Sequence, residues 1–169
     1  MAKSGGGKNS SKSDADENAI KIVARNRRAR FEFELLDKVE AGIVLTGTEV
    51  KSLRNGKASL EESYAGISGD EVWLYGCDIP EYLQANRMNH KPKRPRKLLL
   101  HRSEIDKLLA KASDRGFTIV PLMIYFKKGM AKVEISIARG RKLYDKREAL
   151  KNKDAKRDID RAVRGRGRD

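Results

Sequence analysis

The chain has 169 residues, of which 38 % are hydrophobic and 37 % are charged, and its formal net charge is +14. A length of this order fits one domain with extensions. A single cysteine, Cys77, excludes an internal disulfide. The chain has no apolar N-terminal stretch and no apolar run long enough to span a bilayer, so we expect a cytoplasmic protein without signal peptide or membrane helix.

The net charge is distributed in blocks along the chain. Residues 1–30 carry +5, residues 31–86 carry −7, residues 87–102 carry +7 without any acid, residues 103–138 carry +2 and residues 139–169 carry +7. Three basic segments are thus separated by sequence that resembles a globular domain. A partner with repeating negative charge is the simplest explanation for such blocks, and nucleic acid is the commonest one.

The N-terminal half predicts an extension, a strand and a short helix. Residues 1–25 form an extension that we expect to be disordered, with order beginning near Ile20, because its first part is Gly, Ser, Lys and Asp with almost nothing to bury. Residues 31–45 alternate like a strand with a bend at Gly42. Residues 48–54 predict a helix that is capped by Thr48 and ends at Gly56.

Two hairpins and one longer helix are predicted in the rest of the domain. Residues 64–67 and 71–79 predict strands joined by a turn, and residues 117–126 and 130–139 predict a second pair. Between them, residues 103–115 predict a helix with Ser103 and Asp106 as a capping box and Ile105, Leu108, Leu109 and Ala112 as its apolar face. The last strand predicts Ala131, Val133, Ile135 and Ile137 inside, with Lys132, Glu134 and Ser136 outside.

These elements predict a mainly β fold with some α structure. About six short strands in hairpins, with two or three flanking helices, favour a small antiparallel barrel of the OB-like kind, although periodicity alone leaves a sandwich open. We assign the barrel to residues 26–140 and a basic C-terminal tail to residues 141–169. The tail has too few apolar residues to fold alone, so we expect it to be disordered in solution and to become helical on a polyanion.

The basic loop at residues 87–102, before the helix predicted at residues 103–115, is the first candidate site. Pro92 and Pro95 keep this segment extended, so its cations can follow a line of phosphates. A solvated, mobile loop is the alternative explanation. A second candidate is the arginine segment at residues 26–30, whose guanidinium forks suit phosphate contacts. Glu40, before the bend at Gly42, could accept from a base edge, organise nearby arginines, or be an exposed turn residue.

Catalysis has little support in the sequence. Neither His90 nor His101 has an adjacent carboxylate, and the chain contains no metal-spaced Cys/His set, no P-loop and no GxGxxG motif. We therefore expect no enzyme activity, no cofactor and no metal site.

Five sequence blocks in register resemble the SsrA-binding protein family, also called small protein B. The blocks are residues 26–30 (NRRAR), 40–43 (EAGI), 47–54 with 56–57 (GTEVKSLR and GK), 96–101 (RKLLLH), and 140–142 with 145–147 (GRK and DKR). The resemblance implies an OB-like barrel that binds the tRNA-like domain of tmRNA (SsrA RNA) and escorts it to stalled ribosomes for trans-translation. It also implies a tail that enters the empty mRNA channel of the small subunit and becomes helical there.

The resemblance also implies roles for individual residues. Glu40 and Leu99 match family residues of the surface for the tRNA-like domain, and Asp145, Lys146 and Arg147 match a tail motif tied to tagging. His101 stands where some members have asparagine, and Phe31 where many have histidine. The full predicted RNA-binding set is Asn26, Arg27, Arg28, Arg30, Glu40, Lys51, Arg54, Lys57, His90, Lys91, Lys93, Arg94, Arg96, Lys97, Leu99 and His101.

The predicted ribosome-binding tail comprises Gly140, Arg141, Lys142, Asp145, Lys146, Arg147, Lys151, Lys153, Lys156 and Arg157. The partners are then tmRNA, with one protein molecule per RNA, and the ribosome, without a membrane. Two alternatives remain open at the level of sequence, namely a structural ribosomal protein with basic tails and a generic OB-fold module for single-stranded nucleic acid. The latter needs exposed aromatic residues for base stacking.

Overall fold

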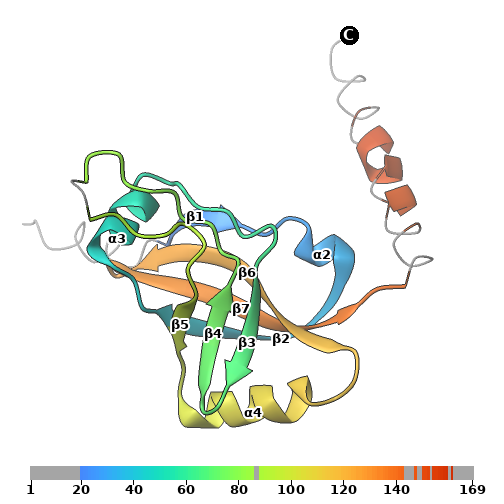
Figure 1. Cartoon of the computed structure of the whole chain (residues 1–169). Helices are drawn as coiled ribbons and strands as arrows, with labels where there is room; N and C mark the ends of the chain where they lie inside the picture. Colours follow the sequence, from blue (N-terminus) through green and yellow to red (C-terminus); the bar gives the residue numbers. More distant parts are fainter. Residues whose placement is uncertain are drawn as a thin grey trace, which may run out of the picture.

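The computed structural model of the chain describes residues 20–85, 88–142, 147, 150–152, 154–159 and 161 (Figure 1). Strands dominate it, as the hairpin pattern predicts. The elements are β1 (Lys21–Arg25), α2 (Ala29–Glu32), β2 (Phe33–Ile43), α3 (Gly47–Arg54), β3 (Tyr64–Ser68), β4 (Glu71–Tyr75), β5 (Arg96–Leu99), α4 (Arg102–Ala112), β6 (Phe117–Lys127) and β7 (Met130–Gly140).

The seven strands form one antiparallel sheet in the order β1-β6-β3-β4-β5-β2-β7. An additional pairing between β6 and β7 joins six of these strands into a ring that is nearly a barrel. The shortest strand pairing in the ring is between β3 and β6, where Ala65 and Ile119 form the only paired positions. The prediction of a mainly antiparallel fold with about six strands is therefore confirmed in the ring, whereas β1, which pairs with β6 outside the ring, was not predicted.

The hydrophobic core fills the ring and is closed by a helix at each end. Figure 1 shows α3 and α4 at opposite ends of the barrel. Leu53 of α3 is 0 % exposed and Leu108 of α4 is 1 % exposed, and both belong to the core cluster. Leu109, predicted to lie on the buried face of α4, is instead 36 % exposed. The two helices therefore act as lids on a core made by the strands.

The predicted alternation of inward and outward side chains along β7 is correct for the inner face, but one residue predicted to face outward is buried. Val133, Ile135 and Ile137 are buried in the core, as predicted. Ser136, predicted to face outward into solvent, is 0 % exposed. A second small apolar cluster covers the outer face of the sheet there, and it consists of Ala29, Val120, Leu122 and Ala138 with Phe33 and Leu35 packed against it. The short helix α2 thus buries part of the barrel's outside.

Both longer helices begin earlier than the sequence predicts. The N-cap of α3 is Thr46 rather than Thr48, because Glu49 reaches back to accept from the Thr46 N–H at 2.8 Å. The N-cap of α4 is His101 rather than Ser103, and Glu104 accepts from the His101 N–H at 2.9 Å. In each case the acid three residues after the cap fixes the first turn.

Two strand boundaries also differ from their predictions. The strand predicted from residue 31 begins at Phe33, because α2 occupies residues 29–32. The strand predicted to reach residue 79 ends at Tyr75. Gly76 follows with a φ of +69°, and a Cβ there would lie 2.8 Å from the carbonyl oxygen of Glu62. Only glycine fits this close approach, and it ends the strand.

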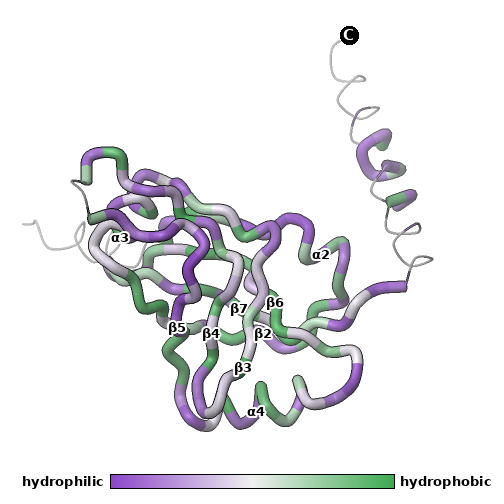
Figure 2. Tube along the Cα trace, in the orientation of Figure 1, coloured by the Kyte–Doolittle hydropathy of each residue, from purple (hydrophilic) through white to green (hydrophobic). Residues whose placement is uncertain are grey.

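The chain ends differ in what the structure describes. β1 lies within the extension expected to be disordered up to residue 25, and residues 1–19 lie outside the described part. In the tail, residues 147, 150–152, 154–159 and 161 are helical, with exposed side chains that are mostly hydrophilic in Figure 2. No helix within the described ranges is long and apolar enough to cross a membrane.

Candidate nucleic-acid interface

A buried ion pair fixes the basic loop to the barrel. Glu49 of α3 lies 2.9 Å from Arg96 Nε of β5 and 2.6 Å from Arg94 Nη2. The side chains of Glu49 and Arg96 are 0 % exposed, while that of Arg94 is 29 % exposed. Burial raises the pKa of Glu49, but the hydrogen bond from Arg94, the Thr46 N–H and the charge of Arg96 outweigh it and hold that pKa below its usual range.

Arg96 and His90 also hold the loop through backbone carbonyls. Arg96 donates to Cys77 O at 2.6 Å, to Pro92 O at 2.8 Å and to Arg94 O at 3.1 Å. His90 is 7 % exposed, with Nε2 2.8 Å from Ile79 O and Nδ1 2.9 Å from Thr48 Oγ1. The prediction that Arg96 and His90 contact RNA is therefore corrected, because their polar groups are buried and already partnered within the fold.

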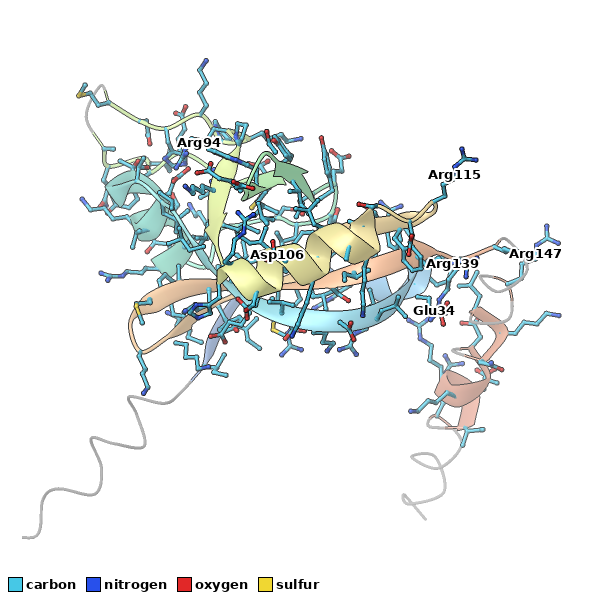
Figure 3. The ribbon with its side chains drawn as sticks, turned by 90° about the horizontal axis from the view of Figure 1, so that it is seen from below. Glu34, Arg94, Asp106, Arg115, Arg139 and Arg147 are labelled. Carbon is cyan, nitrogen blue, oxygen red and sulfur yellow. The ribbon has the colours of Figure 1, made fainter. Side chains whose placement is uncertain are left out.

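The remaining loop cations share one end of the molecule with α3. Lys51, Arg54 and Lys57 are exposed on or after α3, and Lys91 and Lys93 are exposed on the loop. Lys51 Nζ lies 5.5 Å from the centre of the Tyr82 ring. Figure 3 shows Arg94 beside α3, at the opposite end of the molecule from Arg115, Arg139 and Glu34. We call Lys51, Arg54, Lys57, Lys91, Lys93 and Arg94 the α3-end cations.

Glu40 lies on the outer face of β2 among hydrogen-bond donors from the next strands. Its carboxylate accepts from the Tyr125 hydroxyl and lies 3.1 Å from Lys127 Nζ and 3.8 Å from Lys132 Nζ. The Tyr125 hydrogen bond lowers the pKa of Glu40 most, and the two lysines lower it further against a contribution from burial. Glu40 is therefore an ionised, oriented carboxylate on an exposed strand, and not a residue of a flexible turn.

Leu99 lies close to Glu40 on the same face. It pairs with Gly42 across β5 and β2, and the Leu99 side chain covers Gly42 so closely that a Cβ there would lie 3.2 Å from Leu99 Cβ. Leu99 is 53 % exposed and lines a concavity of about 410 Å³ with Val50 and Met130. The structure thus brings Glu40 and Leu99 together, and exposed His101 follows two residues later at the start of α4.

The arginine segment lies at the other end of β1 from the α3-end cations. Lys21, at the start of β1, donates to the carbonyl of Arg54 in α3 at 3.4 Å, whereas α2 follows the end of the strand. Arg27, Arg28 and Arg30 are exposed. The first residues of the basic tail (the tail root, residues 140–142) are fixed beside α2, because the Arg141 N–H donates to Glu32 O at 3.0 Å. The predicted RNA-binding cations are thus divided between the two ends.

Asn26 belongs to the fold and not to the surface. It is 7 % exposed, its amide donates to Leu60 O at 3.1 Å and to Pro121 O at 3.2 Å, and its Oδ1 accepts from the Ala29 N–H at 3.0 Å. The prediction that Asn26 contacts RNA is therefore corrected. This side chain satisfies the backbone where β1 turns into α2, which is how it positions the arginines beside it.

Several residues of this surface were missed by sequence reasoning. Arg25, Tyr125 and Lys127 lie beside the predicted residues, but Arg25 belongs to the unpredicted β1, Tyr125 to the predicted core strand and Lys127 to the turn predicted after that strand. Lys132 and Glu134 were predicted to face outward, yet nothing connected them with Glu40 until the register was known. The pairing of β2 with β7 is the missing information, since it places Glu40 opposite Glu134.

The tail and the remaining predicted residues are placed as follows. Gly140 and Lys142 are exposed and Arg141 is half-buried at the tail root, while Arg147, Lys151, Lys156 and Arg157 are exposed. Asp145, Lys146 and Lys153 lie outside the described residues. Lys97 is half-buried on β5 and forms an ion pair with Glu71. Within the described part of the chain, no group of His, Cys, Asp and Glu side chains could hold a metal ion.

Comparisons with known proteins give one consistent family. The model of the SmpB protein family matches residues 23–165. The SsrA-binding proteins of Rhodopseudomonas palustris (strain TIE-1) and Nitrobacter winogradskyi are 54 % and 56 % identical over 155 residues, covering 91 % of this chain and 99 % of each relative. The SsrA-binding protein of Methylobacterium sp. (strain 4-46) is 57 % identical over 150 residues, 88 % of this chain and 96 % of that protein.

A solved structure supports the same relationship. A chain described under "tmRNA-SmpB: a journey to the center of the bacterial ribosome" is 46 % identical, with a TM-score of 0.62, covering 75 % of this chain and 92 % of that one. An identity of 46 % over 75 % of this chain exceeds what a shared fold alone would give. The resemblance noted from the five sequence blocks is thereby confirmed, and the chain belongs to the SmpB family of SsrA-binding proteins.

Proposed function

We propose that this protein binds the tRNA-like domain of tmRNA and delivers the RNA to stalled ribosomes for trans-translation. The observation that carries the proposal is the family match over residues 23–165, since its members are SsrA-binding proteins rather than enzymes. The barrel is then OB-like, the protein works in the cytoplasm, and one molecule serves each tmRNA.

The face around Glu40 and Leu99 is the proposed surface for the tRNA-like domain. It combines an oriented carboxylate, flanking lysines and an exposed leucine over a glycine, which together offer a hydrogen-bond acceptor, phosphate contacts and an apolar contact. A folded RNA is recognised through such mixed contacts to its shape, its backbone and its unpaired bases. The α3-end cations extend this surface along the RNA backbone.

The basic tail is the proposed ribosome-binding part. Its described residues are helical and exposed, and ion pairs of Arg157 with Asp154 and of Arg161 with Asp158 link positions three apart. Such pairs contribute little in water, so we propose that the tail is disordered in solution and becomes fully helical when rRNA phosphates neutralise its cations. An mRNA channel that is empty would admit it, and an occupied one would not.

A gel-shift titration tests the RNA assignment. The full chain is titrated at physiological salt against the tRNA-like domain of tmRNA, with elongator tRNA and a single-stranded RNA as competitors. We expect complex formation that survives both competitors. Equal affinity for all three RNAs, lost steeply with salt, would contradict the proposal and favour a generic polyanion-binding surface.

A truncation separates the two proposed parts. A chain that ends before Asp145 should keep its affinity for the tRNA-like domain and lose peptide tagging in a reconstituted stalled-ribosome assay. Loss of RNA binding by the truncated chain would contradict the division of labour between barrel and tail.

A further inference from the structure

The outer face of the sheet contains a concave site beside the surface formed by Glu40, Leu99, Lys127 and Lys132, which we call the Glu40 surface. Its volume is about 390 Å³, and its lining combines Leu122 and Met123 of β6 and Glu134 of β7 with Arg25, Arg27 and Arg30 around β1 and α2. This volume is within the range of sites that hold small organic molecules. The lining is unusual for such a site, because arginines and a carboxylate surround an apolar methionine.

Strand register connects this site to Glu40. Met123 pairs with Glu134 on one side and with Arg25 on the other, and Glu134 pairs with Glu40. Directly opposite residues of antiparallel strands point to the same face. A single line of side chains therefore crosses four strands, from Glu40 through Glu134 and Met123 to Arg25.

The three arginines of this site lack carboxylate partners within the described residues. Arg25, Arg27 and Arg30 form no ion pair with any carboxylate of the described chain, whereas the neighbouring Arg28 pairs with Glu32 at 3.1 Å. The three arginines are therefore available to an external anion.

Glu134 contributes a buried carboxylate oxygen to the same site. Its Oε1 is buried and accepts no hydrogen bond within the described residues. Lys38 Nζ lies 3.2 Å from this atom as an ion pair, without the geometry of a hydrogen bond. Glu134 Oε1 thus has a counter-charge but no well-aligned hydrogen bond, so a ligand that donates to it with good geometry gains a hydrogen bond that the free protein lacks.

We propose that this concavity holds one unstacked nucleotide of a bound RNA whose base carries an amino group. Arginine forks bind its phosphate, the base lies on Met123, and the amino group donates to Glu134 Oε1. Adenine, cytosine and guanine carry amino groups from which a carboxylate can accept a hydrogen bond, whereas uracil carries none. An acidic peptide would satisfy the arginines but not Glu134. The assignment rests on the proposed function only in taking RNA as the ligand.

Mononucleotide titration tests the pocket directly. The full chain, labelled with ¹⁵N, is titrated with AMP, CMP, GMP, UMP and inorganic phosphate while amide chemical shifts are recorded. We expect at least one of AMP, CMP and GMP to shift the amides of Arg25, Arg27, Met123 and Glu134, with UMP binding about 5-fold more weakly or worse. Shifts that are the same for all nucleotides and for phosphate would overturn the proposal of a base site.

Glu134→Gln tests the recognition of the base in particular. The change keeps shape and removes the charge, so the preference for the amino-bearing base over UMP should disappear, while shifts at the arginines persist. Glu34→Gln is the matched control, because Glu34 is exposed on β2 and does not line the concavity. An unchanged preference in Glu134→Gln would overturn the assigned contact.

Binding to the tRNA-like domain then separates this proposal from the proposed function. Arg27→Ala and Glu134→Gln should each weaken the complex about 10-fold, whereas Arg115→Ala and Glu34→Gln should not differ from one another by more than about 2-fold. Unaltered affinity in Arg27→Ala and Glu134→Gln, with the unmodified chain binding tightly, would overturn the pocket and leave the function standing. Failure of the unmodified chain to bind would overturn the function, while the nucleotide titration would still decide the pocket.

Discussion

Arg96 Nε and Glu49 Oε1 lie 2.9 Å apart, and both side chains are completely buried. This ion pair joins β5 to α3, and the other guanidinium nitrogens of Arg96 hold the carbonyls of Cys77 and Pro92. The basic loop is therefore positioned from inside the protein, although its charge would suggest a mobile surface segment. A loop that is fixed before binding loses less conformational entropy when RNA arrives.

Removing the charge of Glu49 should destabilise the whole barrel. Glu49→Gln leaves the buried guanidinium of Arg96 without its counter-charge, and breaking a buried pair in this way costs about 3–5 kcal/mol. Urea unfolding monitored by circular dichroism measures the change. Glu61→Gln is the matched control, since Glu61 is exposed and its loss should change stability by less than about 0.5 kcal/mol. Equal unfolding midpoints for the two variants would contradict a structural role for the pair.

Acid should unfold the protein through the same carboxylate. The folded-state pKa of Glu49 is below its usual range, so in the interval between the two pKa values the unfolded chain binds more protons. The stability that Glu49 contributes is thus present above the unfolded pKa and is lost as the pH falls through the folded pKa. Unfolding free energies measured between about pH 5 and pH 3 should decline, and Glu49→Gln should show a shallower decline. A slope that is unchanged in Glu49→Gln would assign the acid sensitivity to other groups.

The strands of the ring could be predicted from the sequence, but the burial of residues on the outer face of the ring could not. Alternation along residues 130–139 and the turn at Lys128 and Gly129, both with positive φ, determine a hairpin from local rules. Whether Ser136 meets solvent depends on α2, which packs on the outside of the sheet from far away in sequence. Local periodicity reports two faces of a strand, and it cannot report which outer positions another element covers.

The same limit explains the corrected site residues. Arg96 and His90 belong to a segment rich in cations, and charge alone predicts exposure. Arg96 is paired with Glu49 and His90 with Thr48, each more than forty positions earlier, and these partners meet only through the β5–β4 pairing and the packing of α3. Glu40, in contrast, was identified correctly as a surface residue from the resemblance to a family. Its hydrogen-bond donors Tyr125 and Lys127 could be identified only from the fold.

Cys77 should be chemically inert while the protein is folded. The side chain is 0 % exposed, and burial raises the pKa of its thiol to about 11 despite the nearby charge of Arg96. Thiolate is the reactive form, so almost none is present at pH 8. A colorimetric thiol reagent should react with one equivalent of protein thiol in urea and with none in buffer over the same minutes. Rapid reaction of the native protein would show that the β4 end of the barrel opens.

Glu40→Ala should separate specific recognition from general attraction to phosphate. Removing an acid adds one unit of positive charge, which by itself strengthens binding to any polyanion. A carboxylate that accepts from the RNA has the opposite effect when it is lost, and one good base contact is worth about 1–3 kcal/mol. We therefore expect Glu40→Ala to bind the tRNA-like domain about 10-fold more weakly while its affinity for a single-stranded RNA stays equal or rises.

The control for this prediction is Glu61→Ala, which makes the same change of charge on an exposed residue outside the Glu40 surface. Filter binding at two salt concentrations provides the affinities for both RNAs. Because Glu40 also orders Tyr125 and Lys127, Tyr125→Phe keeps the carboxylate and removes one hydrogen bond, and it should have a smaller effect than Glu40→Ala. If Glu40→Ala and Glu61→Ala bind the tRNA-like domain alike, Glu40 only organises its neighbours and does not touch the RNA.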